Sequence, residues 1–132
     1  MFTPNHLHLI VRAYVKNPPK TEEGLNKWLT ELVHKVGMQV VAGPTSVYVN
    51  EPGNEGVTGT ITLATSHAAI HVWDNEKPSL VQFDIYSCKE YSIETVLDHF
   101  NEFEMVSYEW IFIDRNQGLD PISKGSKKNI SE

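Results

Sequence analysis

Residues 56–73 read GVTGTITLATSHAAIHVW, and their pattern sets the fold of the chain. Apolar residues occupy every second position through most of this stretch, which is the period of strands that bury one face. We predict two strands, over residues 56–64 and 67–73. Because only a short turn separates them, we expect the two strands to pair antiparallel.

The flanking sequence supplies two helices and four more strands. Residues 21–36 carry large apolar side chains at helical spacing behind Thr21 as a capping residue, and a second helix follows Ser92. The remaining strands are expected at residues 6–15, 39–49, 80–86 and 105–114. The predicted order is therefore β-α-β-β-β-β-α-β. This order favours an α+β two-layer sandwich, a mostly antiparallel sheet with two helices on one face.

The length of 132 residues is typical of one domain. We assign residues 1–118 to that single domain. The segment KGSKKNISE, at the end of the chain, has nothing to bury. We therefore expect residues 119–132 to form a flexible C-terminal tail.

Composition and charge exclude several classes of protein. The formal net charge is −6 and the lysines and arginines form no stripe, so we expect no nucleic-acid binding. We expect no membrane span, since no apolar run approaches the roughly 20 residues that cross a bilayer. The first residues lack the features of a signal peptide. A single cysteine excludes an internal disulfide framework and favours a reducing, cytoplasmic setting.

The polar side of the predicted sheet differs from an ordinary solvent-facing surface. Thr58, His67, His71, Asp84 and Cys88 share the side opposite the apolar residues of their strands. Lysine and glutamate are absent from that side. We therefore expect it to be buried against another sheet or another subunit, with its polar groups held inside.

The spacing of the histidines along the strands tests whether two of them could bind one metal ion. His67 and His71 are four residues apart, about 13 Å along a strand, which is too far for one ion to bridge. His6 and His8 are two apart on one strand face and would need help from elsewhere, so we expect no metal site. Ser66 lies in no G-x-S-x-G motif and precedes no helix, which argues against a serine hydrolase.

Residues 56–73, together with FDIYSC at 83–88, resemble the small bacterial and archaeal S-adenosylmethionine decarboxylase proenzymes. That family shows a Gly-Val-Ser-Gly-like turn, Glu-Ser-His, a strand ending Ile-His-Thr-Trp, and a later strand ending Thr-Cys. The order of the other elements matches over about residues 6–115. In the family, the serine attacks the preceding carbonyl to give an ester, and β-elimination and hydrolysis leave a pyruvoyl group on the larger of two pieces.

Carried over residue by residue, the resemblance implies a set of roles. Ser66 would be the pyruvoyl precursor, which forms a Schiff base with the substrate, and the cut would fall between Thr65 and Ser66. His71 matches the histidine that assists ester breakdown, and Thr58 keeps the hydroxyl of a processing serine. Cys88 matches the cysteine that returns a proton to the substrate carbon. Ser66, His71 and Cys88 are thus expected to face one pocket.

The resemblance also implies a substrate, a cofactor and an assembly. The pyruvoyl carbonyl is the electron sink for decarboxylation, so neither a metal nor pyridoxal phosphate is expected. The small-molecule substrate would be S-adenosylmethionine, decarboxylated for spermidine synthesis. Trp73 and Glu76 are candidate substrate-binding residues. Family members pair with the site at their interface, which implies a homodimer of processed protomers.

Three departures from the family pattern leave alternatives open. Thr65 stands where the family has glutamate, and the loop after Trp73 reads WDNEKP in place of Trp-Pro-Glu. The loop before the Gly-Val-Thr-Gly turn lacks an aromatic that helps to grip adenine, and Tyr48 is only a distant candidate. One alternative is a decarboxylase of ornithine or arginine, as in some relatives. The other is an uncleaved, non-catalytic homologue that acts as a binding or interaction subunit.

Overall fold

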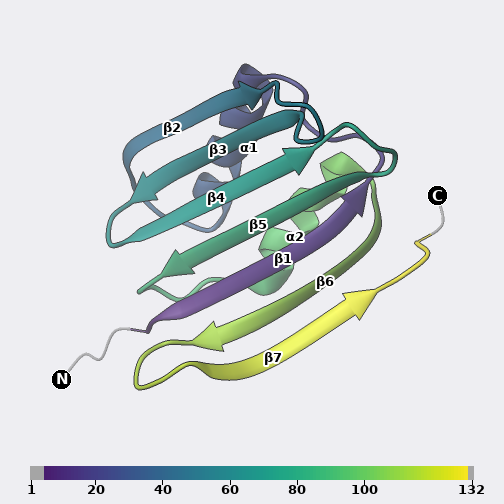
Figure 1. Ribbon diagram of the computed structural model, residues 1–132. Coiled ribbons are helices and arrows are strands. Elements are labelled where there is room, and N and C mark those ends of the chain that lie inside the picture. The colour runs from purple at the N-terminus through teal and green to yellow at the C-terminus, as the bar shows by residue number, and fades with distance from the viewer. Residues whose placement is uncertain (1–4, 131–132) are drawn as a thin grey trace.

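Residues 5–130, which the computed structural model describes, fold into a seven-stranded antiparallel sheet with two α-helices on one face (Figure 1). The elements are β1 (Leu7–Val15), α1 (Glu22–Lys35), β2 (Val40–Val49), β3 (Gly56–Leu63), β4 (Ser66–Trp73), β5 (Ser79–Ser87), α2 (Ile93–His99), the 3₁₀ turn η1 (Phe100–Phe103), β6 (Met105–Asp114) and β7 (Asp120–Lys127). The strands lie in the order β2-β3-β4-β5-β1-β6-β7. The predicted α+β class and the order of the eight predicted elements are confirmed. No helix in the described range is long and apolar enough to cross a bilayer.

The two strands predicted from the opening stretch form the β3–β4 hairpin. Leu63 lies opposite Ser66, so the connecting turn contains only Ala64 and Thr65. The Thr65 φ of 58° lies in the left-handed region. A β-branched residue is rarely found there, and the conformation costs about 1–2 kcal/mol. The turn therefore holds strained backbone directly before Ser66.

Helix α1 packs closely on β3. Thr21 caps the helix by accepting a hydrogen bond from the backbone N–H of Gly24 at 2.9 Å. The buried stripe of the helix consists of Leu25, Trp28, Leu29, Leu32 and Val33. A Cβ on Gly59 would lie 2.8 Å from Leu25 Cδ2 and 3.1 Å from Leu29 Cδ1. Ser46 Oγ would lie nearer still, at 2.5 Å, so the second glycine of the Gly-Val-Thr-Gly segment makes room for both α1 and β2.

Helix α2 and η1 supply the aromatic part of the core. The rings that pack against Trp28 are those of Phe83, Phe100 and Phe103. His99, only 3% exposed, donates from Nε2 to Trp28 O at 2.9 Å and accepts at Nδ1 from Lys35 Nζ at 3.0 Å. Burial lowers the pKa of His99, and the charge of Lys35 lowers it further. His99 is therefore a neutral link between the two helices.

Strand β7 corrects the prediction of a flexible tail for residues 120–127; residues 131–132 of the predicted tail lie outside the described residues. It pairs antiparallel with β6, and most of its side chains are exposed. Because β7 lacks alternating apolar residues, hydrophobic periodicity gives no signal for it. Backbone pairing and one close contact define it instead: a Cβ on Gly125 would come within 2.7 Å of the Trp110 indole. A domain boundary at residue 118 thus leaves out one strand of the sheet.

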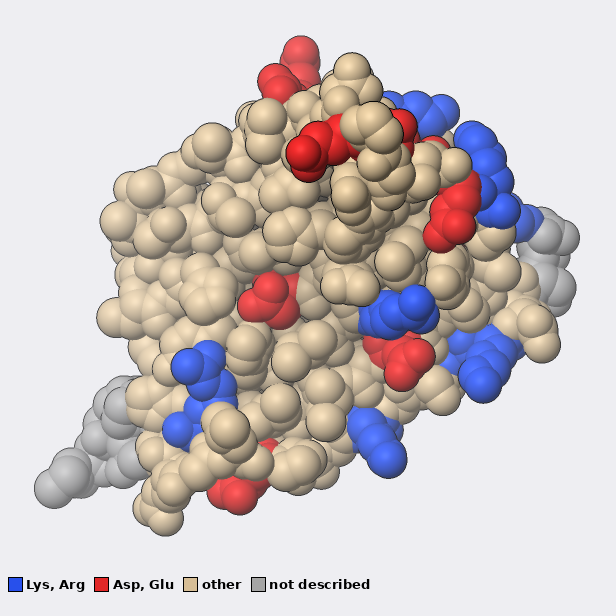
Figure 2. Space-filling model, in the orientation of Figure 1, with Lys and Arg blue, Asp and Glu red and all other residues tan. Residues whose placement is uncertain are grey.

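The sheet face away from the helices is uncovered in the part of the chain that the structure describes (Figure 1). Figure 2 shows that this face is mostly uncharged, with most charged residues gathered toward its rim. Two hollows of about 370 and 580 Å³ lie on it and share Ile10 and Arg12. Ile10 is 39% exposed. The predicted burial of this face against another sheet or subunit stays a prediction.

Candidate active site

Ser66 is the first residue of β4 and points toward the helix-covered side of the sheet. It is 9% exposed and shares the buried parity of Ala68 and Ile70. The sequence predicts a strand that begins at residue 67; the structure begins it one residue earlier. Ser66 is therefore held by strand pairing and is not part of a loose bend.

Ser87, which the sequence did not point to, is the nearer of two hydrogen-bond partners of the Ser66 hydroxyl, the other being Ala64 O at 3.3 Å. The Ser66 hydroxyl donates to Ser87 Oγ at 2.9 Å, and the fully buried Ser87 Oγ also accepts from the Lys89 backbone N–H at 2.9 Å. Ser87 lies one residue beyond the His67–Tyr86 pair of the β4–β5 ladder. The only signal in the sequence was its parity, because a serine on the core side of a strand needs a partner.

Cys88 follows β5 directly and lies against the β3–β4 turn. Its Sγ is 2.6 Å from Thr65 Oγ1, and Thr65 Oγ1 also donates to Ala64 O at 2.6 Å. The thiol is partly buried. The Thr65–Ser66 peptide bond is therefore flanked by a hydroxyl acceptor, Ser87, and by a thiol.

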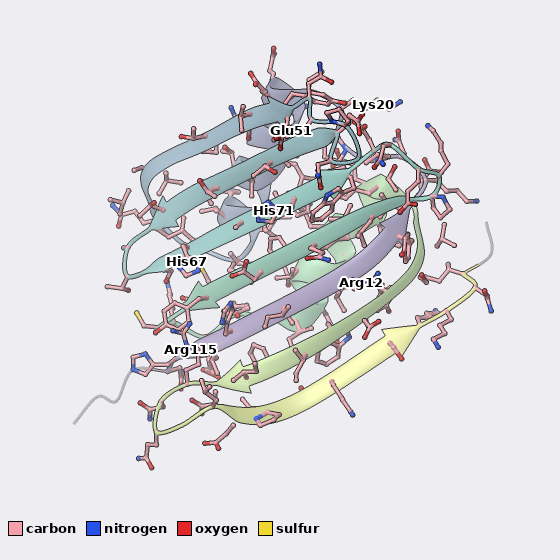
Figure 3. The ribbon with its side chains drawn as sticks, in the orientation of Figure 1. Arg12, Lys20, Glu51, His67, His71 and Arg115 are labelled. Atoms are coloured by element: carbon pink, nitrogen blue, oxygen red, sulfur yellow. The ribbon has the colours of Figure 1, made fainter. Side chains whose placement is uncertain are left out.

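His71 lies on the uncovered face of the sheet (Figure 3), where it forms a separate pair with Thr58. Thr58 Oγ1 and His71 Nδ1 are 3.2 Å apart, on directly opposed positions of β3 and β4. His71 is five residues from Ser66, about 16 Å along the strand, and its side chain lies on the opposite face. The expectation that Ser66, His71 and Cys88 face one pocket is therefore wrong within a single chain.

Trp73 and Glu76 lie toward the far end of β4. The Trp73 indole donates to Asn54 Oδ1 at 3.2 Å, and Glu76 is exposed in the β4–β5 loop. The Tyr48 hydroxyl donates to the Asp74 carboxylate at 3.0 Å, and this hydrogen bond raises the pKa of Tyr48. Tyr48 thus borders the same loop as Trp73, although the two are far apart in sequence.

A third cluster joins β1, β4 and β5 on the uncovered face. Asp84 Oδ2 accepts from His8 Nε2 at 2.9 Å and lies 3.6 Å from His67 Nε2. Arg115 donates to His8 Nδ1 at 3.3 Å, and its Cζ lies 4.2 Å from the Tyr86 ring centroid. Burial by itself raises the pKa of Asp84, but the two histidines outweigh it, so that the pKa is lowered.

This third cluster is also the group of side chains nearest to a metal-binding arrangement. The ligand atoms of His8, His67 and Asp84 lie within 4.8 Å of one another. Because Arg115 donates to His8 Nδ1, His8 Nε2 carries the hydrogen that Asp84 accepts. A ring in that tautomer offers no lone pair at Nε2, and metal-bound histidines usually donate from their other nitrogen. The hydrogen bonds therefore favour a proton-sharing cluster, and the absence of a metal stays a prediction.

Comparison with known proteins assigns the chain to a family. Residues 7–116 match the sequence model of the family described as S-adenosylmethionine decarboxylase. The chain belongs to the S-adenosylmethionine decarboxylase family. The S-adenosylmethionine decarboxylase proenzyme of Archaeoglobus fulgidus is 34% identical over 96 residues, which cover 71% of this chain and 80% of that protein. The resemblance of residues 56–88 to this family is therefore confirmed.

Membership in this decarboxylase family places the chain among the carboxy-lyases. The matched range contains the Ser66 turn, the Thr58–His71 pair and the cluster around Asp84. Strand β7 lies beyond it. The three clusters are thus features of the family-matched part of the sheet.

Proposed function

We propose that this decarboxylase cuts its own chain between Thr65 and Ser66 and uses the resulting pyruvoyl group to decarboxylate S-adenosylmethionine. The turn at these two residues is the observation that carries the proposal. A left-handed threonine, with a φ of 58°, precedes a buried serine whose hydroxyl donates to Ser87. The family match, and the description of the relative as a proenzyme, support the proposal.

Cleavage needs only groups of the chain and one water molecule. The Ser66 oxygen attacks the Thr65 carbonyl carbon, its proton passes by way of Ser87 Oγ to the Ser66 nitrogen, and the peptide C–N bond breaks to give an ester and a free Ser66 amine. Loss of the Ser66 α-proton and of the Thr65 carboxylate leaves a dehydroalanine. Its imine tautomer is hydrolysed to the pyruvoyl group with release of ammonia. Strain at Thr65 favours the first step, because cutting the bond releases it.

The residues around position 66 suit the product of this cleavage. A terminal carbonyl supplies the electron sink that amino-acid decarboxylation needs, which ordinary side chains do not offer. The Ser87 hydroxyl, within hydrogen-bond distance of the Ser66 side chain, would hold that end of β4 in place. Cys88 is the proposed acid that protonates the substrate carbon, and its contact with Thr65 beside the cut supports this role.

The proposal includes a homodimer. Ser66 and His71 of one chain are about 16 Å apart along β4 and on opposite faces. A His71 that assists breakdown of the Ser66 ester must therefore come from a second copy. Two-fold pairing gives both copies the same contacts. The uncovered, mostly uncharged sheet face with the exposed Ile10 supports association of two copies (Figure 2), and their contact must also include the hairpin turn before Ser66.

S-adenosylmethionine is the proposed substrate because both comparisons name it. Trp73 and Tyr48 offer aromatic rings near the far end of β4, and Asp74 offers a carboxylate in the same loop. Aromatic faces and a carboxylate suit a cationic substrate that carries an aromatic base. Glu76 is a further candidate in that loop. Supply of spermidine synthesis, in a cytoplasmic setting, belongs to the same proposal.

Mass spectrometry of the purified chain after long incubation tests self-cleavage. We expect two fragments, cut after Thr65, with a blocked N-terminus on the larger one. Ser66→Ala is the matched control and should remain a single species of full mass. A wild-type chain that stays whole would contradict the proposal and favour the uncleaved binding subunit.

Release of carbon dioxide tests the substrate and the proton donor. S-adenosylmethionine, ornithine and arginine are assayed side by side, and we expect turnover of the first. Cys88→Ala should still be cleaved but should lose most of its decarboxylation. Normal turnover by Cys88→Ala would show that the thiol is not the proton donor, whereas turnover of ornithine or arginine alone would change only the substrate.

A further inference from the structure

We propose that Thr65 is a positioning residue whose hydroxyl holds the Cys88 thiol against the turn until the Thr65–Ser66 bond is cut. Thr65 has this role only if the proposed self-cleavage occurs, so the inference rests on that function and deepens it. Thr65 is also a position at which the chain departs from the family pattern. The proposal therefore gives a function to a residue that the family resemblance leaves without one.

Two contacts of a single oxygen atom carry the proposal. Thr65 Oγ1 lies 2.6 Å from Cys88 Sγ and 2.6 Å from Ala64 O. Within residues 5–130, Thr65 is the hydrogen-bond partner of Cys88. The left-handed backbone of Thr65, with a φ of 58°, sets the direction of this side chain. The contact therefore depends on the closed hairpin turn.

The direction of the two hydrogen bonds follows from the number of hydrogens. A threonine hydroxyl has one hydrogen, and a carbonyl oxygen can only accept. The Thr65 hydrogen therefore goes to Ala64 O, and the Thr65 oxygen is left to accept from Cys88. The thiol is engaged as S–H, which is the form that a proton donor requires.

Cutting the chain would remove the basis of this contact. Thr65 becomes the last residue of the shorter piece and loses its peptide link to Ser66. Its strained conformation is then no longer maintained by the closed turn. The Thr65 hydroxyl leaves Cys88, and the thiol is released to face position 66 once the carbonyl there has formed.

The rate of alkylation by iodoacetamide tests the contact directly. The chain has a single cysteine, so the reagent reports on Cys88 alone. All variants carry Ser66→Ala, which keeps the chain whole. Thr65→Ser and Thr65→Ala form the matched pair, because both lack the threonine methyl and only the first keeps the hydroxyl.

We expect Thr65→Ala to be alkylated about threefold to tenfold faster than Thr65→Ser, the range that one net hydrogen bond supports. The thiolate is the species that reacts, so a thiol held as S–H by Thr65 should react more slowly. Thr65→Ser should stay within about twofold of threonine. If Thr65→Ala does not fold, as judged by circular dichroism, Thr65→Gly replaces it, because glycine adopts a positive φ readily.

Equal alkylation rates for the alanine and serine variants would overturn the proposal. Failure of the proposed function gives a different result, since the wild-type chain then stays whole while the Ser66→Ala series still reports on the contact. In a cleaved wild-type sample, we expect alkylation to be faster than in Ser66→Ala by a similar factor. An unchanged rate after cleavage would contradict release of the thiol.

Discussion

The two ends of β4 carry different chemical groups in different surroundings. At the first end, Ser66 is buried and donates to Ser87, with the Cys88 thiol beside the turn. Toward the far end, His71 pairs with Thr58 on the uncovered face of the sheet. The first end carries two hydroxyls and a thiol, whereas the second carries an imidazole beside a hydroxyl.

Under the proposed function, this separation means that one chain carries two halves of a site. A strand rises about 3.3 Å per residue and alternates its faces, so no change of rotamer brings His71 to Ser66. In a two-fold dimer, by contrast, Ser66 of each copy can meet His71 of the other copy. The proposed role of His71 in cleavage therefore requires a second copy of the chain.

The largest expected effect comes from mixing variants that damage opposite ends of β4. Ser66→Ala and His71→Ala should each remain whole as separate proteins. When the two are co-expressed, the His71→Ala chain should be cleaved, because its Ser66 meets the intact His71 of the other copy. Intact-mass spectra of differently tagged chains identify which chain is cut.

The matched control pairs His71→Ala with a chain that carries both substitutions. That mixture contains Ser66 but no His71, and it should stay whole. A mixture of the two single variants that also stays whole would mean that the two ends do not complement each other across copies.

The next largest effect, on the rate of cleavage, is expected at Ser87, which accepts the hydrogen bond from Ser66 at the first end of β4. Ser87→Ala removes the oxygen to which Ser66 donates at 2.9 Å, so we expect cleavage to slow by about tenfold or more. Ser87→Thr keeps a hydroxyl and should cleave at close to the wild-type rate. The appearance of fragments over time measures both. Cleavage of Ser87→Ala at the wild-type rate would remove Ser87 from the mechanism.

A smaller effect, on the stability of the chain, is expected from the packing of α1 against Gly59 of β3, which lies opposite Ile70 of β4. Gly59→Ala forces a Cβ to within 2.8 Å of Leu25 Cδ2, so we expect a loss of about 1–3 kcal/mol in the free energy of unfolding. Urea denaturation measures it. Gly118→Ala is the control, because a Cβ there meets only Asp120 atoms, at 3.7 Å or more. Equal stability of the two variants would contradict the close packing of α1 on β3.

The smallest expected effect is a pH-dependent change in the stability of the whole chain. It does not distinguish the two ends of β4, because it arises at His99, between the helices. The pKa of His99 is lowered from its ordinary 6.5 by burial. Its contribution to stability is therefore full above about pH 6.5 and is lost as the pH falls through the lower pKa of the folded state. Thermal unfolding between pH 8 and pH 5 should show this loss in Ser66→Ala, which keeps the chain whole.

The same chain with His99→Gln is the control, since an amide can still donate to Trp28 O and does not titrate. The loss of stability on acidification should be smaller in this variant. An identical pH dependence in both chains would show that His99 is not buried as a neutral ring. The lowered pKa of Asp84 acts in a different window, below its ordinary 3.8.

Much of the fold could be predicted because the relevant signals are local. Alternation identified β3 and β4, and the apolar stripe behind Thr21 identified α1. Strand β7 gave no such signal, since it buries little and is defined by pairing with β6. Its clearest contact, between Trp110 and Gly125, joins two residues whose pairing the sequence does not reveal.

The candidate site was predictable as a list of residues but not as an arrangement. The motif residues Thr58, Ser66, His71 and Cys88 could be named from their likeness to a family. The placement of Ser66 and His71 on opposite faces of the sheet could not, because it depends on whether Ser66 belongs to the turn or to the strand. A shift of one residue exchanges the faces.

The sequence by itself determined the α+β class, the central hairpin, the capped helix and the membership of the S-adenosylmethionine decarboxylase family, to which residues 7–116 belong. Only the tertiary structure decided that Ser66 meets Ser87, that Thr65 meets Cys88, and that His71 lies apart from all of them. The physical reason is that periodicity and capping act between near neighbours in the chain. Contacts between strands are set by register, which brings together residues 21 and 23 positions apart and keeps residues five positions apart from meeting.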